Sequence, residues 1–220
     1  MIFREIIFLE AAGLKQIGRK IVPTQWVKER YIYRRLGAKA GPIYLRLRTM
    51  DAAGIRSENE RRVPASAKSV VFVCFGNIMR SAMAEHWMIR AMREERRHDI
   101  EVSSAGMHAT SGNSAHPWAQ LAAEGAGLSL VNHRAQLLTQ EMVDETDALL
   151  AMDFQNKAEL LAQYPDAADR VFMLSAYADP PLRGREIPDP YFGDEKRTRA
   201  CCAEIEVCVR RLLATLQKPE

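Results

Sequence analysis

The chain alternates between short apolar runs and longer stretches in which apolar residues recur every three or four positions. Short runs of this kind predict buried parallel strands, and four of them lie near residues 69–74, 99–104, 147–152 and 170–174. The longer stretches predict amphipathic helices near residues 82–97, 116–126, 139–145, 154–163 and 195–216. Because strands and helices alternate, we expect an α/β fold, with a four-stranded parallel sheet and helices on both faces.

One junction between a predicted strand and a predicted helix carries a reactive side chain. The strand at 69–73 is followed by Cys-Phe-Gly-Asn-Ile-Met-Arg-Ser, residues 74–81. A loop that joins a strand to a helix N-terminus binds oxyanions, because its N–H groups converge and the helix dipole favours negative charge. Arg80 adds a guanidinium that can hold two phosphate oxygens. The pattern therefore predicts a phosphate site in which Cys74 can attack the phosphorus.

The residues between Cys74 and the helix suit such a loop. A cysteine at a strand end, taken alone, is more often a buried core residue than a reactive one. Here Gly76 allows close backbone approach or a positive φ, and Asn77 tolerates the left-handed region. Ser81 can cap the helix and hydrogen-bond a thiolate. The expected substrate-binding residues of the loop are Phe75, Gly76, Asn77, Ile78, Met79 and Ser81.

Residues 70–86 resemble the signature of the low-molecular-weight protein tyrosine phosphatase family. The resemblance continues, in the family's order, through the sequences at 104–106, 133–135, 147–153 and 187–191, and it covers about residues 67–217. It implies a four-stranded α/β fold and the hydrolysis of phosphotyrosine monoesters through a phosphocysteine intermediate. It implies no metal and no cofactor.

Asp189 is the candidate proton donor. It lies between two prolines, which restrict the loop that presents it. Alone, this sequence is typical of an ordinary Asp-Pro turn. In the family that the chain resembles, the matching aspartate is a general acid and then a general base. The resemblance thus implies three catalytic residues, Cys74, Arg80 and Asp189, with Tyr191 and Phe192 as an aromatic wall of the substrate slot.

Cysteine usage and hydropathy bear on location. Four cysteines in 220 residues do not form the pattern of a disulfide scaffold, so we expect a reducing, cytoplasmic compartment. Cys201 and Cys208 share the apolar stripe of the last helix and are expected in the core, whereas Cys202 falls off the stripe and is expected to be more exposed. The histidines show no ligand spacing, so no metal site is expected. No apolar stretch reaches the length of a membrane span.

The first 66 residues lie outside the resemblance. They hold 14 Lys and Arg against 6 Asp and Glu, a net charge of +8, whereas the rest holds 17 against 22, a net charge of −5; the sum is the +3 of the whole chain. Short helices are expected at about residues 2–12, from Thr24 to Leu36, and after Pro42. Residues 57–68 are polar and predict a linker. We therefore divide the chain into a basic, mainly helical N-terminal extension with linker, residues 1–66, and a phosphatase catalytic domain, residues 67–220.

Several roles for this extension remain open. Aromatic residues among its basic ones suit an anionic membrane surface, which would place the protein at the inner face of the membrane. The extension could instead dock on a partner protein or on the acidic catalytic domain. It could also be a leader outside the natural start, or a solvated basic segment without a special role. Nothing in it predicts binding to a specific nucleic acid.

Three alternatives to a tyrosine phosphatase remain. A thiol-dependent arsenate reductase on the same fold needs relay cysteines, and none occurs between Phe75 and Ala200. Bacterial protein arginine phosphatases resemble this chain but carry Thr where it has Ile78, and an apolar residue favours a phosphotyrosine pocket. A non-catalytic phosphate-binding adaptor would not need Cys74 or Asp189. The expected partner is a phosphotyrosine-containing protein, which at family level includes bacterial tyrosine kinases of polysaccharide export.

Overall fold

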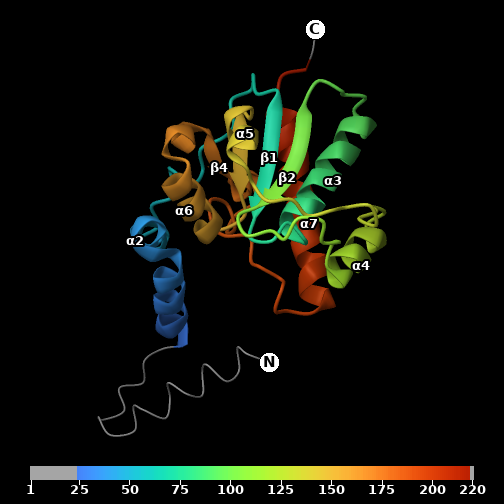
Figure 1. Cartoon of the computed structure of the whole chain (residues 1–220). Helices are drawn as coiled ribbons and strands as arrows, with labels where there is room; N and C mark the ends of the chain where they lie inside the picture. The colour runs from blue at the N-terminus through green and yellow to red at the C-terminus, as the bar shows by residue number, and fades with distance from the viewer. Residues whose placement is uncertain (1–23, 219–220) are drawn as a thin grey trace, which may run out of the picture. The chain divides into compact units, whose positions relative to one another are not determined.

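The sheet has the predicted strands. A computed structural model describes residues 24–218 of the chain, so the helix expected at 2–12 lies outside the described residues. Four parallel strands pair in the order β2-β1-β3-β4 (Figure 1). Their bounds are β1 Ser69–Cys74, β2 Glu101–Gly106, β3 Ala148–Ala151 and β4 Val171–Met173. The expected sheet is confirmed, and every strand end lies within two residues of its predicted position.

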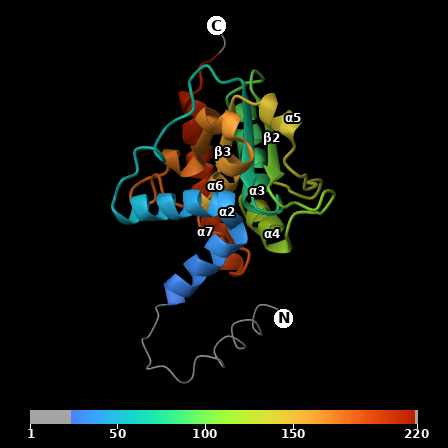
Figure 2. The same ribbon diagram turned by 60° about the vertical axis from the view of Figure 1, so that its left-hand side comes forward.

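The helices predicted after residue 80 are also present. They are α3 Arg80–Glu94, α4 Pro117–Gly125, α5 Gln140–Asp144, α6 Phe154–Gln163 and α7 Glu195–Thr215, with 3₁₀ turns η1 Pro165–Arg170 and η2 Leu174–Tyr177. Helices lie on both faces of the sheet: α3 and α7 pack together on one face, and α6 packs against β3 and β4 on the other (Figures 1 and 2). Among the described residues, no helix combines the length and apolar content needed to cross a bilayer.

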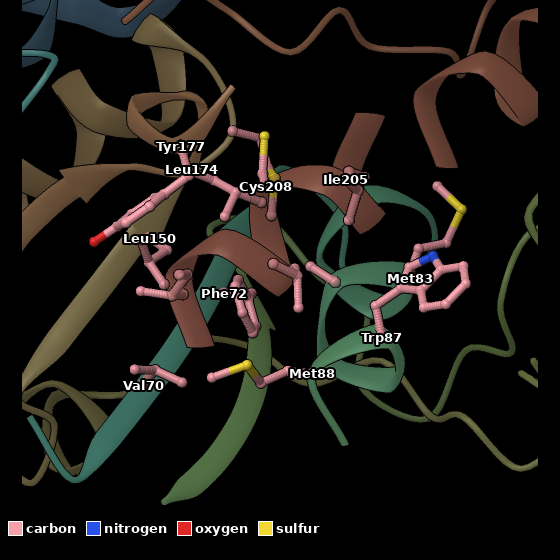
Figure 3. Close-up of a cluster of buried hydrophobic side chains, with 14 of the residues drawn as sticks. Val70, Phe72, Met83, Trp87, Met88, Leu150, Leu174, Tyr177, Ile205 and Cys208 are labelled. Atoms are coloured by element: carbon pink, nitrogen blue, oxygen red, sulfur yellow. The ribbon is translucent and has the colours of Figure 1, made fainter. Parts of the chain in front are cut away.

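The main core fills the space between the sheet and helices α3 and α7. Alternate strand residues, such as Phe72 and Leu150, point into it, as the period of two along a strand requires (Figure 3). Trp87 from α3 and Ile205 from α7 meet them there. The expected exposure of Cys202 is wrong. It is 2% exposed and its Sγ accepts a hydrogen bond from the indole N–H of Trp87, because α7 packs against both α3 and α4 and so buries more than one stripe.

The helix before the sheet, α2 Thr24–Ala52, is broken at Gly37. Gly37 has φ 69° and ψ −168°, which is the left-handed region that glycine adopts without penalty. The start at Thr24 and the break after Leu36 were predicted. The next helix begins before Pro42 and includes it, rather than starting after it. Pro42 lies beyond the first turn after Gly37, so its missing N–H removes one intrahelical hydrogen bond.

Residues 57–68 are bound to the sheet domain. Asn59 and Val63 are buried, although the polar composition of this segment predicts a linker. The Val63 N–H donates to the Tyr177 hydroxyl at 2.9 Å, and the Lys157 ammonium on α6 donates to Asn59 Oδ1 at 2.8 Å. The compact unit that contains the sheet begins at Tyr33. The division at residue 67 stays a prediction. A chain shortened to start at residue 67 would lose these contacts, so its stability tests the division.

The burial of Lys157 has a pH signature. Desolvation lowers the pKa of its ammonium from 10.5 to about 8, although the Glu58 carboxylate acts in the opposite direction. Between these two pH values the unfolded chain binds more protons than the folded one, so stability rises with pH. We expect the wild type to gain free energy of unfolding relative to Lys157→Met as the pH rises from about 8 to about 10.5. Urea unfolding of both proteins measures this difference, and parallel pH profiles would contradict it.

Candidate active site

The loop between β1 and α3 closes around the sulfur of Cys74. Cys74 is the last residue of β1 and is 4% exposed. The Asn77 backbone N–H donates to Cys74 Sγ at 3.3 Å, and Ser81 Oγ is hydrogen-bonded to the same sulfur at 3.0 Å. Ser81 lies inside α3, whose N-cap is Met79, so the expectation that Ser81 caps the helix is wrong. The two contacts hold the sulfur in place at the start of the loop.

Asn77 fixes the shape of the loop. Its φ is 52°, the left-handed conformation expected for it. Its side-chain N–H₂ donates to Ser81 Oγ at 2.9 Å and to Ser104 Oγ at 2.7 Å, while its Oδ1 accepts from the Gln136 N–H at 2.9 Å. Its carbonyl accepts from His133 Nε2 at 2.6 Å. The buried Asn77 is thereby fully paired, and the unusual backbone conformation is held by residues from three other segments.

The end of β2 touches the loop so closely that only glycine fits there. A Cβ on Gly106 would lie 2.8 Å from the Asn77 nitrogen and from the Phe75 carbonyl oxygen, both of them backbone atoms that cannot give way. The carbonyl of Cys74 accepts from the Met107 N–H at 2.9 Å, which fastens the two segments together. The position of the loop therefore depends on β2 as well as on β1.

Arg80 is a buried cation between two carboxylates. Its side chain is 2% exposed. Nη1 donates to Asp153 Oδ2 at 2.7 Å and to the Ile187 carbonyl at 3.1 Å, and Nη2 donates to Asp189 Oδ2 at 2.9 Å. Burial lowers the pKa of Arg80, but Asp153 and Asp189 outweigh burial and raise it well above its ordinary value. The guanidinium is thus a permanent positive charge that joins the loop to the candidate acid.

The segment that leads to Asp189 is held by the helix before the sheet. Glu186, three residues before Asp189, accepts from the Phe154 N–H at the start of α6 at 3.2 Å. Its other oxygen pairs with Arg48 of α2 at 2.9 Å. A residue of the N-terminal extension thus contacts the side chain that fixes the approach to the candidate acid.

Aromatic rings form two pairs near the loop. Tyr191 is half-exposed and lies edge-on to His116, with ring centroids 5.5 Å apart; the His116 N–H donates to the Ile78 carbonyl at 2.8 Å. Phe75 packs against His108 with ring centroids 4.6 Å apart.

The other predicted substrate-binding residues differ in how far their side chains are exposed at the loop. Phe192 is 79% exposed and lies edge-on to Tyr191. The Met79 side chain is buried in the main core, which leaves only its backbone to the loop, whereas Gly76 and Ile78 are partly exposed.

Within residues 24–218, one cluster has potential metal ligands. Ligand atoms of Glu85, His86 and His133 lie within 4.8 Å of one another, although the sequence shows no ligand spacing. Each already has a structural hydrogen bond: Glu85 Oε2 accepts from Ser104 Oγ at 2.6 Å, and His86 Nδ1 is bonded to a carbonyl of its own helix at 3.0 Å. Burial lowers the pKa of His133, so its Nε2 supports the loop as a neutral donor. We assign this cluster to support of the loop.

The sequence did not single out Ser104, His133 or Asp153 as site residues. The only signal was that each lies in a segment that carries the resemblance.

A parallel α/β sheet whose first strand ends in a cysteine, followed by a tight loop and a buried arginine at a helix start, is an arrangement suited to holding a phosphate. Residues 69–220 match the family model described as low molecular weight phosphotyrosine protein phosphatase. The chain belongs to this family, whose members are hydrolases, as the resemblance implied.

Similar proteins include tyrosine and arginine phosphatases. The chain is 30% identical to the low molecular weight protein-tyrosine-phosphatase Ptp of Acinetobacter johnsonii, over 64% of this chain and 93% of that protein. The tyrosine phosphatase amsI of Erwinia amylovora superposes with a TM-score of 0.62 at 26% identity, over 69% of this chain and 95% of that one. A mutant of the YwlE arginine phosphatase, with a phosphorylated active site serine, gives 0.62 at 30% identity, over 66% and 93%.

The contact between Arg48 and Glu186 predicts a local change in dynamics. In Arg48→Ala we expect faster amide hydrogen exchange in peptides covering residues 183–192, because Glu186 loses its cation. Arg46→Ala is the matched control, since Arg46 on the same helix pairs with Glu58, outside this segment, at 2.8 Å. Hydrogen-exchange mass spectrometry compares the two variants. Equal acceleration in both would show that α2 acts only through general stability.

Proposed function

We propose that this protein hydrolyses phosphotyrosine monoesters in proteins through a phosphocysteine at Cys74. The single observation that carries the proposal is the buried Arg80, which starts the helix behind the Cys74 loop and touches Asp189 at 2.9 Å. This contact supports a site in which the nucleophile, the oxyanion donors and the proton donor act on one phosphoryl group. A fixed positive charge and converging N–H groups stabilise the charge that develops on a transferring phosphoryl group.

In the first step, the thiolate of Cys74 attacks the phosphorus. The new S–P bond forms as the P–O bond to the aryl group breaks, and the Asp189 carboxylic acid gives its proton to the leaving phenolate. An incoming phosphate takes the place of Asp189 at Arg80 Nη2, while Nη1 stays bonded to Asp153, and Asp189 is then free to turn towards the leaving oxygen. The mutant YwlE arginine phosphatase with its phosphorylated serine supports such a covalent intermediate by analogy.

In the second step, water attacks the phosphocysteine. The Asp189 carboxylate accepts a proton from this water as the O–P bond forms and the S–P bond breaks. The products are inorganic phosphate and the Cys74 thiolate. The sulfur is again hydrogen-bonded by the Asn77 N–H and by Ser81 Oγ. Asp189 is again protonated, so the cycle closes.

A phosphotyrosine substrate fits the surroundings of the loop better than phosphoarginine. The half-exposed ring of Tyr191 and the partly exposed Ile78 offer an apolar slot that suits an aryl ring. Because arginine phosphatases are among the similar proteins, paired peptides carrying phosphotyrosine or phosphoarginine in one sequence decide between them. Faster release of phosphate from the phosphoarginine peptide would reverse the assignment.

The thiol environment argues against an arsenate reductase. Such a relay needs a second reactive thiol, and burial raises the pKa of both Cys201 and Cys208 to about 12. Burial also raises the pKa of Cys202, which is bonded to Trp87. Thiols in such surroundings are poor nucleophiles.

Leaving-group dependence tests the role of Asp189. Cys74→Ser should abolish turnover with the fold intact. Asp189→Ala should reduce kcat by roughly 10²–10⁴ with phenyl phosphate, the range for a lost general acid. The loss should be smaller with p-nitrophenyl phosphate, whose leaving group needs less protonation. Steady-state kinetics with both substrates measure this, and equal losses would remove Asp189 from the acid role.

The basic N-terminal extension is the reason to propose that the enzyme is cytoplasmic and associates with the inner face of an anionic membrane. Its net charge of +8 against −5 for the rest of the chain favours such a surface, and docking on a partner protein is the competing interpretation. The phosphorylated partner, as for the family, is a phosphotyrosine protein such as a tyrosine kinase of polysaccharide export.

Vesicle binding separates these interpretations of the extension. The full chain should sediment with phosphatidylserine vesicles at low salt, less so as salt rises, and Lys28→Gln/Arg30→Gln should weaken the binding. No sedimentation at low salt would exclude the membrane role.

A further inference from the structure

A cavity of about 320 Å³ lies beside the Cys74 loop. The helix before the sheet, the end of β2 and helix α6 together line it. Its lining residues include Leu36, Lys39, Ala40, Met107, His108 and Glu159. Three of these residues come from the N-terminal extension, which lies outside the residues that match the family model.

This cavity adjoins the nucleophile through the backbone. The N–H groups of Met107 and His108 donate to the carbonyls of Cys74 and Phe75 at 2.9 and 2.8 Å. The His108 ring, which lines the cavity, packs against the exposed Phe75 ring. One extended residue spans about 3.3 Å, so a peptide whose phosphate sits in the loop and whose chain runs over Phe75 brings its neighbouring residues to the cavity.

The rim of this cavity is cationic. Arg35 holds its guanidinium carbon 4.9 Å from the centroid of the Phe75 ring and hydrogen-bonds Gln155 of α6. Lys39 is exposed on the rim, and residues 33–40 contain no acidic residue. Within the described part of the chain, no ion pair involves Arg35 or Lys39. The one carboxylate in the lining, Glu159, accepts from His108 Nε2 at 2.9 Å.

We propose that Arg35 and Lys39 form a subsite for an acidic residue beside the phosphorylated residue of a protein substrate. The proposal rests on the proposed function, since a phosphate at Cys74 sets the register of the peptide. The cation–π contact fixes Arg35 against the rim, so its positive charge stays close to where the peptide passes. The extension thus adds sequence selectivity to a domain whose loop recognises only the phosphorylated side chain.

Two phosphotyrosine peptides, one with Glu and one with Ala at the flanking positions, test this subsite. Wild-type kcat/KM should favour the Glu peptide by roughly 1.4- to fivefold at low salt, which is the range for exposed charge pairs, and the preference should shrink as salt rises. Arg35→Gln/Lys39→Gln should abolish the preference. Arg34→Gln, which removes one positive charge from the neighbouring exposed residue, should largely retain it. Equal loss in the Arg34 variant would overturn the subsite in favour of a general field.

A binding experiment separates this proposal from the proposed function. Fluorescence anisotropy with a Cys74→Ala variant, which has no side chain that can accept the phosphoryl group, compares the affinity of the two peptides without turnover. If wild type hydrolyses neither peptide, the proposed function fails, and the same anisotropy comparison still decides the subsite. Tighter binding of the Glu peptide supports it, and equal affinities overturn it.

Discussion

The buried guanidinium of Arg80 is the constraint around which the rest of the site is arranged. A cation with almost no access to water must be paired, because an unpaired buried charge costs several kcal/mol (about 3–5 when one partner is removed). The partners come from different parts of the sheet: Asp153 from the end of β3, and the carbonyl of Ile187 and the carboxylate of Asp189 from the loop before α7. One charge thereby fixes the relative positions of three segments that meet at the carboxyl edge of the sheet.

The parts of this arrangement that are local in sequence were predictable. The strand, loop and helix around Cys74 occupy consecutive residues, so their apolar spacing and turn residues were sufficient to locate them. The hydrogen bonds that hold the loop could not be predicted in this way, because they join residues that are far apart in the sequence. Asn77 and Ser104 are 27 residues apart, His133 and Asn77 are 56 apart, and Arg80 and Asp153 are 73 apart. A contact between such distant residues leaves no period in the sequence.

The same limit explains the two errors over burial. Cys202 falls outside a single helical stripe, but α7 is covered on two sides, and no property of α7 alone reveals its second neighbour. Asn59 lies in a polar segment whose composition is that of a linker, yet a buried ammonium on α6 requires its amide oxygen. A polar segment is exposed only if none of its polar groups pairs with a buried group elsewhere in the fold. Here the buried group is Lys157, which lies 98 residues from Asn59 in the sequence.

This partnership has an evolutionary consequence. A chain that lost the segment around Asn59 would leave the ammonium of Lys157 buried without its amide oxygen, and a chain that acquired Lys157 first would meet the same cost. Gain or loss of the extension is therefore tied to a substitution at one position of α6. Among relatives of different length, the residue aligned with Lys157 should indicate which ones carry a comparable segment packed on the sheet domain.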